Sequence, residues 1–401
     1  MKPELLAELI TKNDSKIIFM VMDGLGGHPI DGDGCELEIA NTPNLNRFAR
    51  EGITGVLDPV SPGITPGSGP GHLALFGYDP LDNLIGRGVL SALGIDFELT
   101  GRDVACRLNF CTLDDNGIVM DRRAGRIATE INEKLCKILR ENVSLGDNVE
   151  FFLQSVSEHR AVLVLRGDGL GGDINDTDPQ KTGLPPREAK GANEASQKTV
   201  GYINSFLQQT HELLKNEAPA NMVLARGFAA FNPLPTMEER YGLKAAAVAQ
   251  YPMYRGLARL VGMDVFPRPE SYDAMYQQIR DNYDAYDFFF VHFKKTDSSG
   301  EDGDFNKKVK IIEEIDAWAA QLRDLNPTVL AVTGDHSTPS KFSAHSWHPV
   351  PTLLWSDNCR PDRVTEFGEN ACIGGAIGRM ETKHLMMLCM ANALRLNKFG
   401  A

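Results

Sequence analysis

Two segments near the start of the chain offer an acid and a nucleophile. Asp23 directly follows the apolar run of residues 16–22, and Ser68 lies in a turn of small residues, 65–71, that leads into an apolar helix. The N–H groups at the start of a helix are free and the helix dipole is positive there, so this position would stabilise a serine alkoxide and a phosphate bound to it. A turn residue at Asp23 and a helix cap at Ser68 are the alternative interpretations.

Two later segments combine carboxylates with histidines. Residues 292–304 hold one histidine and four carboxylates at the end of an apolar run. Asp335 and His336 follow another such run, with His345 and His348 downstream. Carboxylate oxygens and imidazole nitrogens at one rim suit a divalent cation. A solvated acidic loop and a capping aspartate beside a buried core histidine are the alternatives.

The elements that must position these residues alternate between strands and helices. Short apolar runs predict strands at 16–22, 161–165, 288–293, 328–333 and 351–355. Longer stretches predict helices at 43–51, 193–216, 271–283, 305–325 and 382–396. This alternation is typical of a parallel sheet covered by helices on both faces, in which ligands bind outside the carboxyl ends of the strands. Asp23, Asp297 and Asp335 fall at such ends.

The composition is that of a globular protein and limits the possible partners. The chain has 401 residues, enough for roughly two or three domains of typical size. A net charge of −13 argues against a broad surface for nucleic acid or an anionic membrane, so an anionic ligand would need a local cationic or metal site. No apolar window is long enough for a membrane helix, and residues 1–16 lack the apolar stretch of a signal peptide. Seven scattered cysteines without a CxxC pair favour a reducing cytoplasm over a disulfide framework.

Residues 98–235 differ in composition from the rest of the chain, because they are rich in arginine, aspartate and turn residues. We predict that they form a smaller domain inserted into a larger one made of residues 1–97 and 236–401. The planar guanidinium of arginine matches carboxylates and phosphates bidentately, so the arginines of this segment are candidates for binding an anion. For any single arginine, a solvated surface charge is the alternative.

Taken together, the segments resemble the alkaline phosphatase superfamily. The shared features are Val-Met-Asp-Gly at 21–24, Thr-Pro-Asn-Leu at 42–45, the Ser68 turn, a strand ending before Asp297, Gly-Asp-His at 334–336 and Ala-His-Ser at 344–346. Further motifs resemble the archaeal-type 2,3-bisphosphoglycerate-independent phosphoglycerate mutase family, namely Pro-Gly-Ser at 66–68, Phe-Gly-Tyr-Asp-Pro at 76–80, Asp-Arg-Arg-Ala-Gly-Arg at 121–126, Glu-His-Arg at 158–160 and Asp-Thr-Asp-Pro at 176–179. The resemblance covers nearly the whole chain.

The resemblance implies an alkaline-phosphatase-like α/β fold, in which helices cover a mostly parallel sheet and a smaller α/β domain is inserted. It also implies two divalent metal ions, Mn²⁺ or Mg²⁺. The residues implied for the first metal are Asp23, Ser68, Asp335 and His336, and those for the second are Asp297, Glu301 and His345. Members of the family usually carry a histidine where this chain has Glu301, and a glutamate oxygen would make the site harder and more negative. His292 and His348 are alternative donors.

The activity implied by the resemblance is the interconversion of 3-phosphoglycerate and 2-phosphoglycerate, in glycolysis and gluconeogenesis. Ser68 would carry the phosphoryl group between the two hydroxyls of one glycerate, without a bisphosphoglycerate primer. The candidates for substrate binding are Arg107, Arg122, Arg126, His159 and Arg160 in the insertion and Arg255 outside it. Two alternatives remain open: another metal-dependent phosphoryl-transfer enzyme, such as a phosphomonoesterase or a kinase-like relative, and a non-catalytic protein that binds metal or phosphate.

Overall fold

We describe the fold from a computed structural model, in which residues 3–30, 32 and 34–400 are placed. The chain forms two units. One consists of the residues up to Leu84 together with those from Leu234 onward, and the other runs from Ile85 to Pro233. Within the described part of the chain, no helix is both long and apolar enough to cross a lipid bilayer.

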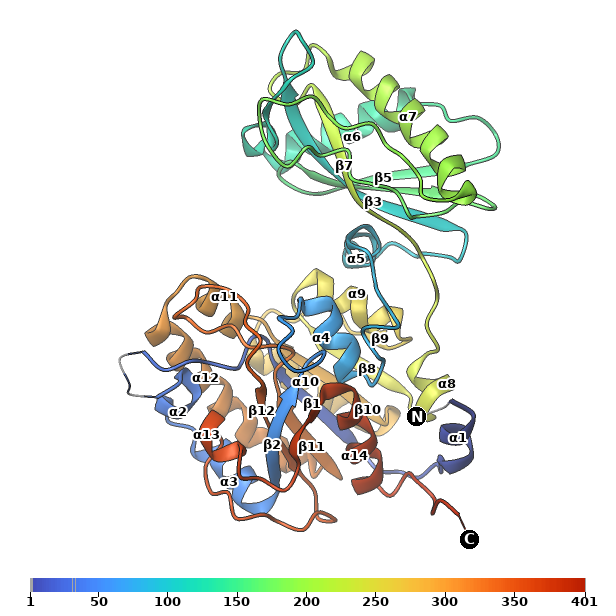
Figure 1. The fold of residues 1–401 in the computed structure, drawn as a ribbon. Coiled ribbons are helices and arrows are strands. Elements are labelled where there is room, and N and C mark those ends of the chain that lie inside the picture. Colours follow the sequence, from blue (N-terminus) through green and yellow to red (C-terminus); the bar gives the residue numbers. More distant parts are fainter. Residues whose placement is uncertain (1–2, 31, 33, 401) are drawn as a thin grey trace. The chain divides into compact units, whose positions relative to one another are not determined.

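The larger unit is built on an eight-stranded sheet (Figure 1). Its strands, in spatial order, are β13 (Gly378–Glu381), β2 (Ile53–Asp58), β12 (Val350–Trp355), β11 (Val329–Thr333), β1 (Ile17–Met22), β10 (Phe288–Phe293), β8 (Ala245–Ala249) and β9 (Asp264–Val265). Every neighbouring pair from β11 to β9 is parallel, as is β13 with β2, so the mostly parallel sheet predicted from the sequence is confirmed. β12 is antiparallel to β11 and β2, because the connection from β11 returns without a crossover helix.

Helices cover both faces of this sheet. One face carries α2 (Glu36–Ile39), α3 (Pro43–Glu51), α10 (Tyr272–Asp281), α12 (Phe305–Ala319) and α13 (Glu369–Cys372), and the other carries α4 (Ser68–Leu75), α9 (Pro252–Leu260) and α14 (Leu385–Asn392). Successive side chains of a strand point to opposite faces, so a strand covered on both sides is apolar throughout. All six residues of β1 are buried, and Ile18, Met20 and Met22 pack into the core with α3 and α12.

Short elements complete the larger unit. They are α1 (Pro3–Leu9), α8 (Met237–Tyr241), α11 (Lys295–Glu301) and 3-10 turns at Tyr283–Ala285, Ala320–Leu325 and Thr382–His384. The helix predicted at 382–396 is shorter than expected, because Leu394 adopts a φ of 55° that a right-handed helix does not allow.

The second unit contains an antiparallel sheet of five strands. β3 (Asp103–Leu113) pairs with β4 (Val119–Asp121), β6 (Arg160–Arg166) and β7 (Met222–Ala230), and β6 also pairs with β5 (Glu150–Ser157). α6 (Thr129–Asn142) and α7 (Glu194–Leu214) cover one face, where Leu108, Leu163 and Val223 join the core. The side chains that alternate with these, among them Arg107 and Arg226, lie on the opposite face.

The second unit begins earlier than the insertion predicted at 98–235. The reason is helix α5 (Arg87–Gly94), which packs against β3 and β7 of this unit. Gly88 allows the close approach, because a Cβ at this position would lie 2.3 Å from the carbonyl oxygen of Ala105 on β3. A 3-10 turn at Ala124–Arg126 completes the elements of the unit.

Candidate functional site

The first group of candidate ligands lies at the carboxyl ends of β1 and β11. These strands are adjacent and parallel, so Asp23 after β1 and Asp335 and His336 after β11 meet at one edge of the sheet. Nε2 of His336 lies 3.3 Å from Oδ1 of Asp23 and 3.2 Å from Oδ2 of Asp335, and all three side chains are fully buried. Ser68 is placed beside them, with its Oγ 3.4 Å from Nε2 of His336.

Ser68 is the first residue of α4, three residues before the end of the turn predicted at 65–71, and it does not cap the helix. Gly67 occupies the N-cap position, and no side chain there accepts a capping hydrogen bond. The helix-cap interpretation of Ser68 is therefore wrong. Its hydroxyl is directed toward the carboxylate and imidazole group instead.

The carboxylates of the first group fit a divalent cation. Both oxygens of Asp23 and Oδ2 of Asp335 are buried and have no hydrogen bond of good geometry, which is unfavourable for a buried charge without a nearby cation. Burial opposes ionisation of Asp23, but the neighbouring imidazoles of His292 and His336 outweigh it and hold the pKa well below its ordinary value. Nδ1 of His72 lies 3.1 Å from Oδ2 of Asp335. An ionised, incompletely paired set of oxygens with one imidazole suits Mn²⁺ or Mg²⁺.

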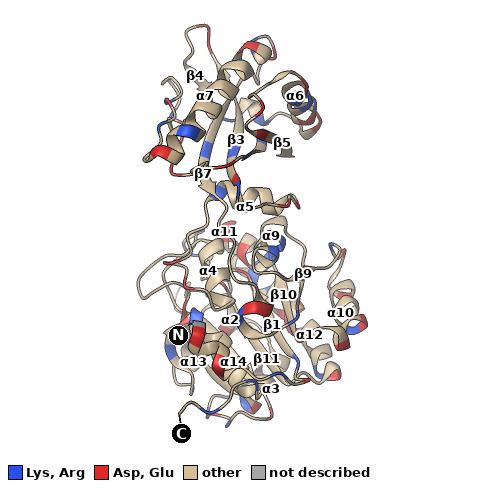
Figure 2. Cartoon of the chain, turned by 90° about the vertical axis from the view of Figure 1, so that its right-hand side faces the viewer, with Lys and Arg blue, Asp and Glu red and all other residues tan. Residues whose placement is uncertain are grey.

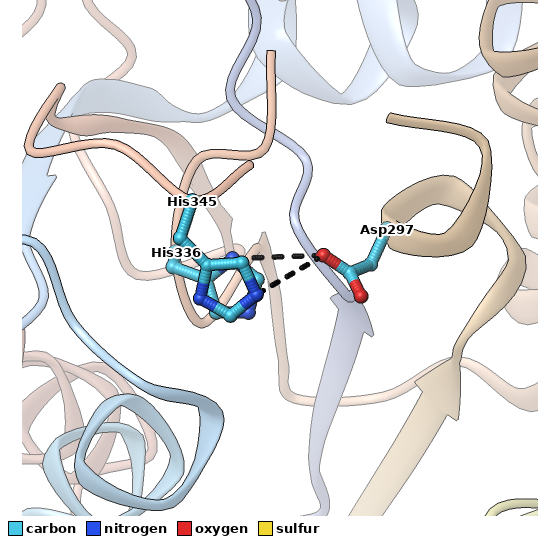
Figure 3. Close-up of side chains that lie close together, drawn as sticks. All are labelled: Asp297, His336 and His345. Atoms are coloured by element: carbon cyan, nitrogen blue, oxygen red, sulfur yellow. Dashed lines mark ion pairs between the residues drawn. The ribbon is translucent and has the colours of Figure 1, made fainter. Parts of the chain in front are cut away.

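A second group of candidate ligands consists of Asp297, His336 and His345 (Figure 3), and it shares His336 with the first. Asp297 comes from α11 after β10, and Nε2 of His345 lies 3.6 Å from its Oδ1. Nδ1 of His345 donates to the carbonyl oxygen of Pro66 at 2.9 Å, so Nε2 is the nitrogen that faces Asp297. The ring of His336 stacks on that of His345, and its Nδ1 lies 4.0 Å from Asp297, so His336 stands between the two groups. Glu301 is beside this group, 3.8 Å from His345, with half of its side chain exposed.

Two polar residues that the sequence analysis did not select join the two groups. The ammonium of Lys294 contacts Asp297 and lies 3.2 Å from Oδ2 of Asp23. The hydroxyl of Thr338 donates to Asp297 at 2.6 Å and lies 2.9 Å from Nδ1 of His336. A signal for both is present in the sequence, since each lies two or three residues from a predicted ligand.

The two histidines considered as alternative donors for the second metal lie elsewhere. Nε2 of His292 is 3.4 Å from Oδ2 of Asp23, in the first group, and its ring stacks on Tyr254 at 3.9 Å. The ring of His348 stacks on the half-exposed Trp347 at 5.0 Å.

An arginine-rich cavity of about 300 Å³ lies in the second unit. It is lined by Arg107, Asn109, Arg122, Arg123, Arg126, Glu158, His159, Arg160 and Arg226. Figure 2 shows basic residues (blue) on β3 and β7, the strands that carry Arg107 and Arg226. The lining has six guanidinium groups and one carboxylate, so the cavity is strongly cationic. Five of the residues predicted to bind substrate are brought together here, and Arg123 and Arg226 were not predicted.

One buried acid orders part of this cavity. Asp178 is fully buried and accepts two hydrogen bonds from Arg122, at 2.8 and 2.6 Å, while Arg226 approaches it at 3.5 Å. Burial, together with the positive charge of Arg160, lowers the pKa of His159 to about 4, so its imidazole is neutral at neutral pH. The cavity therefore offers fixed guanidinium groups and one neutral ring.

Arg255 is the one residue predicted to bind substrate that belongs to the larger unit. It lies on α9 of the larger unit, is 9% exposed, and donates to the carbonyl oxygens of Phe266 at 2.7 Å and Ala249 at 3.3 Å. These contacts hold α9 against the end of β8.

Comparison with known proteins identifies the family. Residues 49–221 match the model of a family described as 2,3-bisphosphoglycerate-independent phosphoglycerate mutase. The chain is 47% identical over 400 residues to a protein of Thermotoga sp. (strain RQ2), with 100% of this chain and 99% of the relative covered, and 49% identical to one of Thermus thermophilus, with 99% and 98% covered. Both are named probable 2,3-bisphosphoglycerate-independent phosphoglycerate mutases. The chain belongs to this family.

Solved structures agree with the assignment to this mutase family. A protein from Pyrococcus horikoshii has a TM-score of 0.81 and 31% identity, with 97% of this chain and 100% of that chain covered. A cofactor-independent phosphoglycerate mutase from Thermoplasma acidophilum has a TM-score of 0.74 and 31% identity, with 94% and 100% covered. The family resemblance and the fold class predicted from the motifs are confirmed.

Proposed function

We propose that this protein interconverts 3-phosphoglycerate and 2-phosphoglycerate by metal-dependent intramolecular phosphoryl transfer, without a bisphosphoglycerate primer. The observation that carries the proposal is the position of Ser68 beside two groups of carboxylate and imidazole side chains, in which both oxygens of Asp23 and Oδ2 of Asp335 are buried without a hydrogen bond of good geometry. The names of the relatives support the substrate class.

Ser68 is proposed as the nucleophile of the reaction. Bound divalent cations would lower the pKa of the serine hydroxyl and neutralise phosphoryl oxygens. The Oγ–P bond forms as the bond from phosphorus to the glycerate oxygen breaks, and that oxygen takes up a proton. The first turn of α4 offers the N–H groups of Ser68 and Gly69, which precede the hydrogen bonds within the helix and would favour the negative charge of a phosphate on Ser68.

The two groups of ligands would hold the two cations. Asp23, Asp335 and His336 form the first group with Ser68, and Asp297 and His345 form the second. Glu301 is proposed as a further donor of the second group, since its carboxylate lies 3.8 Å from His345. The ammonium of Lys294 contributes a fixed positive charge between them.

The arginine cavity is proposed to bind the glycerate. The carboxylate and the phosphate of phosphoglycerate both match the guanidinium fork, and the cavity has guanidinium groups in excess of carboxylates. Retention of glycerate while the phosphoryl group is on Ser68 is what distinguishes a mutase from a phosphomonoesterase. The cavity therefore favours the mutase over the hydrolase that the larger unit alone could support.

The test is a coupled assay for formation of 2-phosphoglycerate from 3-phosphoglycerate. We expect turnover without added primer, loss of turnover after exhaustive chelation, and recovery on addition of Mn²⁺. Release of glycerate and inorganic phosphate as the main products would favour the phosphomonoesterase. Full turnover after chelation would contradict the metal-dependent mechanism.

A further inference from the structure

A fully buried lysine lies behind the two loops that carry the first group of ligands. Lys308, on α12, has no exposed surface. Its Nζ donates to the carbonyl oxygens of Gly24 at 2.9 Å, Gly26 at 3.1 Å and Thr338 at 2.9 Å. A lysine ammonium has three N–H donors, so these three carbonyls satisfy it completely. Lysine is almost never fully buried without such partners.

The carbonyls come from two different loops of the candidate metal centre. Gly24 and Gly26 follow Asp23 after β1, and Thr338 lies two residues after His336 in the connection that follows β11. The loops also meet directly, because the backbone N–H of Thr338 bonds the carbonyl oxygens of Gly24 at 3.2 Å and Gly26 at 3.1 Å. The ammonium concentrates positive charge where carbonyl dipoles of both loops converge.

The contact with Thr338 extends to the second group of ligands. While its carbonyl accepts from Lys308, its hydroxyl donates to Asp297 at 2.6 Å and lies 2.9 Å from Nδ1 of His336. When Nδ1 of His336 carries the proton, Nε2 is left to face Asp23 and Asp335. Lys308 thus holds the residue that orients ligands of both groups.

We propose that Lys308 is a positioning residue of the metal centre, which sets the spacing of the loops bearing Asp23 and His336 and thereby the affinity for the cations. This inference rests on the metal binding of the proposed function. The hydrogen bonds of Lys308 go to backbone carbonyls and not to candidate ligand side chains or Ser68, and the nearest carboxylate among the described residues is that of Glu36, at 3.8 Å.

Arg395 provides a matched control in the same unit. It is also a buried cation, 1% exposed, that donates to the backbone carbonyls of Asn13 at 2.7 Å and Ser15 at 3.0 Å and pairs with Asp287 at 2.8 Å. It belongs to neither group of ligands. Arg395→Met should therefore lower stability without changing the metal centre.

The experiment is a titration of the metal-free full chain with Mn²⁺, in which free Mn²⁺ is measured by electron paramagnetic resonance. Thermal unfolding of each variant is recorded in parallel. Lys308→Met should weaken Mn²⁺ binding roughly tenfold or more, as loss of outer-shell partners of metal ligands does. Arg395→Met should unfold at a lower temperature yet keep its Mn²⁺ affinity. Lys308→Gln, which retains two N–H donors, should lose less affinity than Lys308→Met and decides the question if Lys308→Met does not fold.

Three results would overturn the inference, and they are distinguishable. Unchanged Mn²⁺ affinity in both Lys308 variants, with normal binding by the unsubstituted protein, would refute the positioning role alone. An equal loss in Arg395→Met would show that affinity follows global stability and would also refute it. Absence of Mn²⁺ binding by the unsubstituted protein would refute the proposed function together with this inference.

Discussion

Asp178 is the buried acid on which the arginine cavity depends, and Asp178→Asn is the change that tests this dependence. Its carboxylate accepts two hydrogen bonds from Arg122 and one from the backbone N–H of Gln180, at 2.8 Å. Burial opposes its ionisation, but the contacts with Arg122 and Gln180 outweigh it and hold its pKa below the ordinary value. Asparagine keeps the size of the side chain and removes the negative charge and one acceptor.

The magnitude follows from the exposure of the partners. A hydrogen bond to a charged group contributes about 1.5–3 kcal/mol, and loss of one partner of a fully buried ion pair costs about 3–5 kcal/mol. Asp178 is fully buried, but the side chains of Arg122 and Arg226 are 25% and 21% exposed, so water can partly solvate their charges after the change. We therefore expect a loss of about 2 kcal/mol in the free energy of unfolding.

The assay compares this variant with an equally buried pair outside the cavity. Asp103 accepts two hydrogen bonds from Arg166, both at 2.7 Å, and Arg166 is 22% exposed. In urea unfolding, Asp103→Asn and Asp178→Asn should show similar losses in the free energy of unfolding. Only Asp178→Asn should raise the KM for phosphoglycerate, by about tenfold, which corresponds to about 1.4 kcal/mol of binding free energy. Equal KM changes in the two variants, or none in Asp178→Asn, would refute the role of Asp178 in ordering the cavity.

Three further predictions concern single side chains. Ser68→Ala should abolish mutase turnover and phosphorylation of the protein by labelled substrate while circular dichroism and Tm stay near normal; retained turnover would place the nucleophile elsewhere. Burial lowers the pKa of His159 to about 4 in the folded protein, against about 6.5 in the unfolded chain, so the free energy of unfolding should fall by up to about 3 kcal/mol as the pH drops from 6.5 to 4. Urea unfolding of His159→Gln should lack this part of the pH dependence. Glu301→Gln should weaken one of two Mn²⁺ affinities in a titration; two unchanged affinities would remove Glu301 from the ligands.

The central part of the fold could be predicted because burial leaves a direct trace in the sequence. β1, β10 and β11 are covered on both faces and are therefore continuous apolar runs, and each ends in the polar residues of the site. β8 was not predicted, because it consists of four alanines and one valine and alanine is not favoured in strands. Its strand conformation is set by pairing with β10 and by cover from α9, which are tertiary contacts.

The residues that support the site were harder to predict than the candidate ligands. Asp178 and Arg226 are far apart in the sequence and meet because Thr177, next to Asp178, bonds the backbone of Ala225 on β7. Lys308 lies in a run of lysines that is typical of a solvated face. Helical spacing does carry a signal, since Lys308 is three and four residues before the buried Ile311 and Ile312 and so lies on the inward face of α12.

The protein has a net charge of −13, and the two units differ in the positive charge that each could present to an anion. The second unit uses permanent guanidinium charges, several of which are already ordered by Asp178 and Glu158, so its cavity can hold a carboxylate at any neutral pH. The larger unit instead gathers carboxylates around Ser68, and in the proposed function this arrangement would accept a phosphoryl group only when cations neutralise them. Removal of metal should therefore stop the chemistry at Ser68 while leaving the arginine cavity able to bind glycerate, because its charges belong to side chains that do not lose their protons.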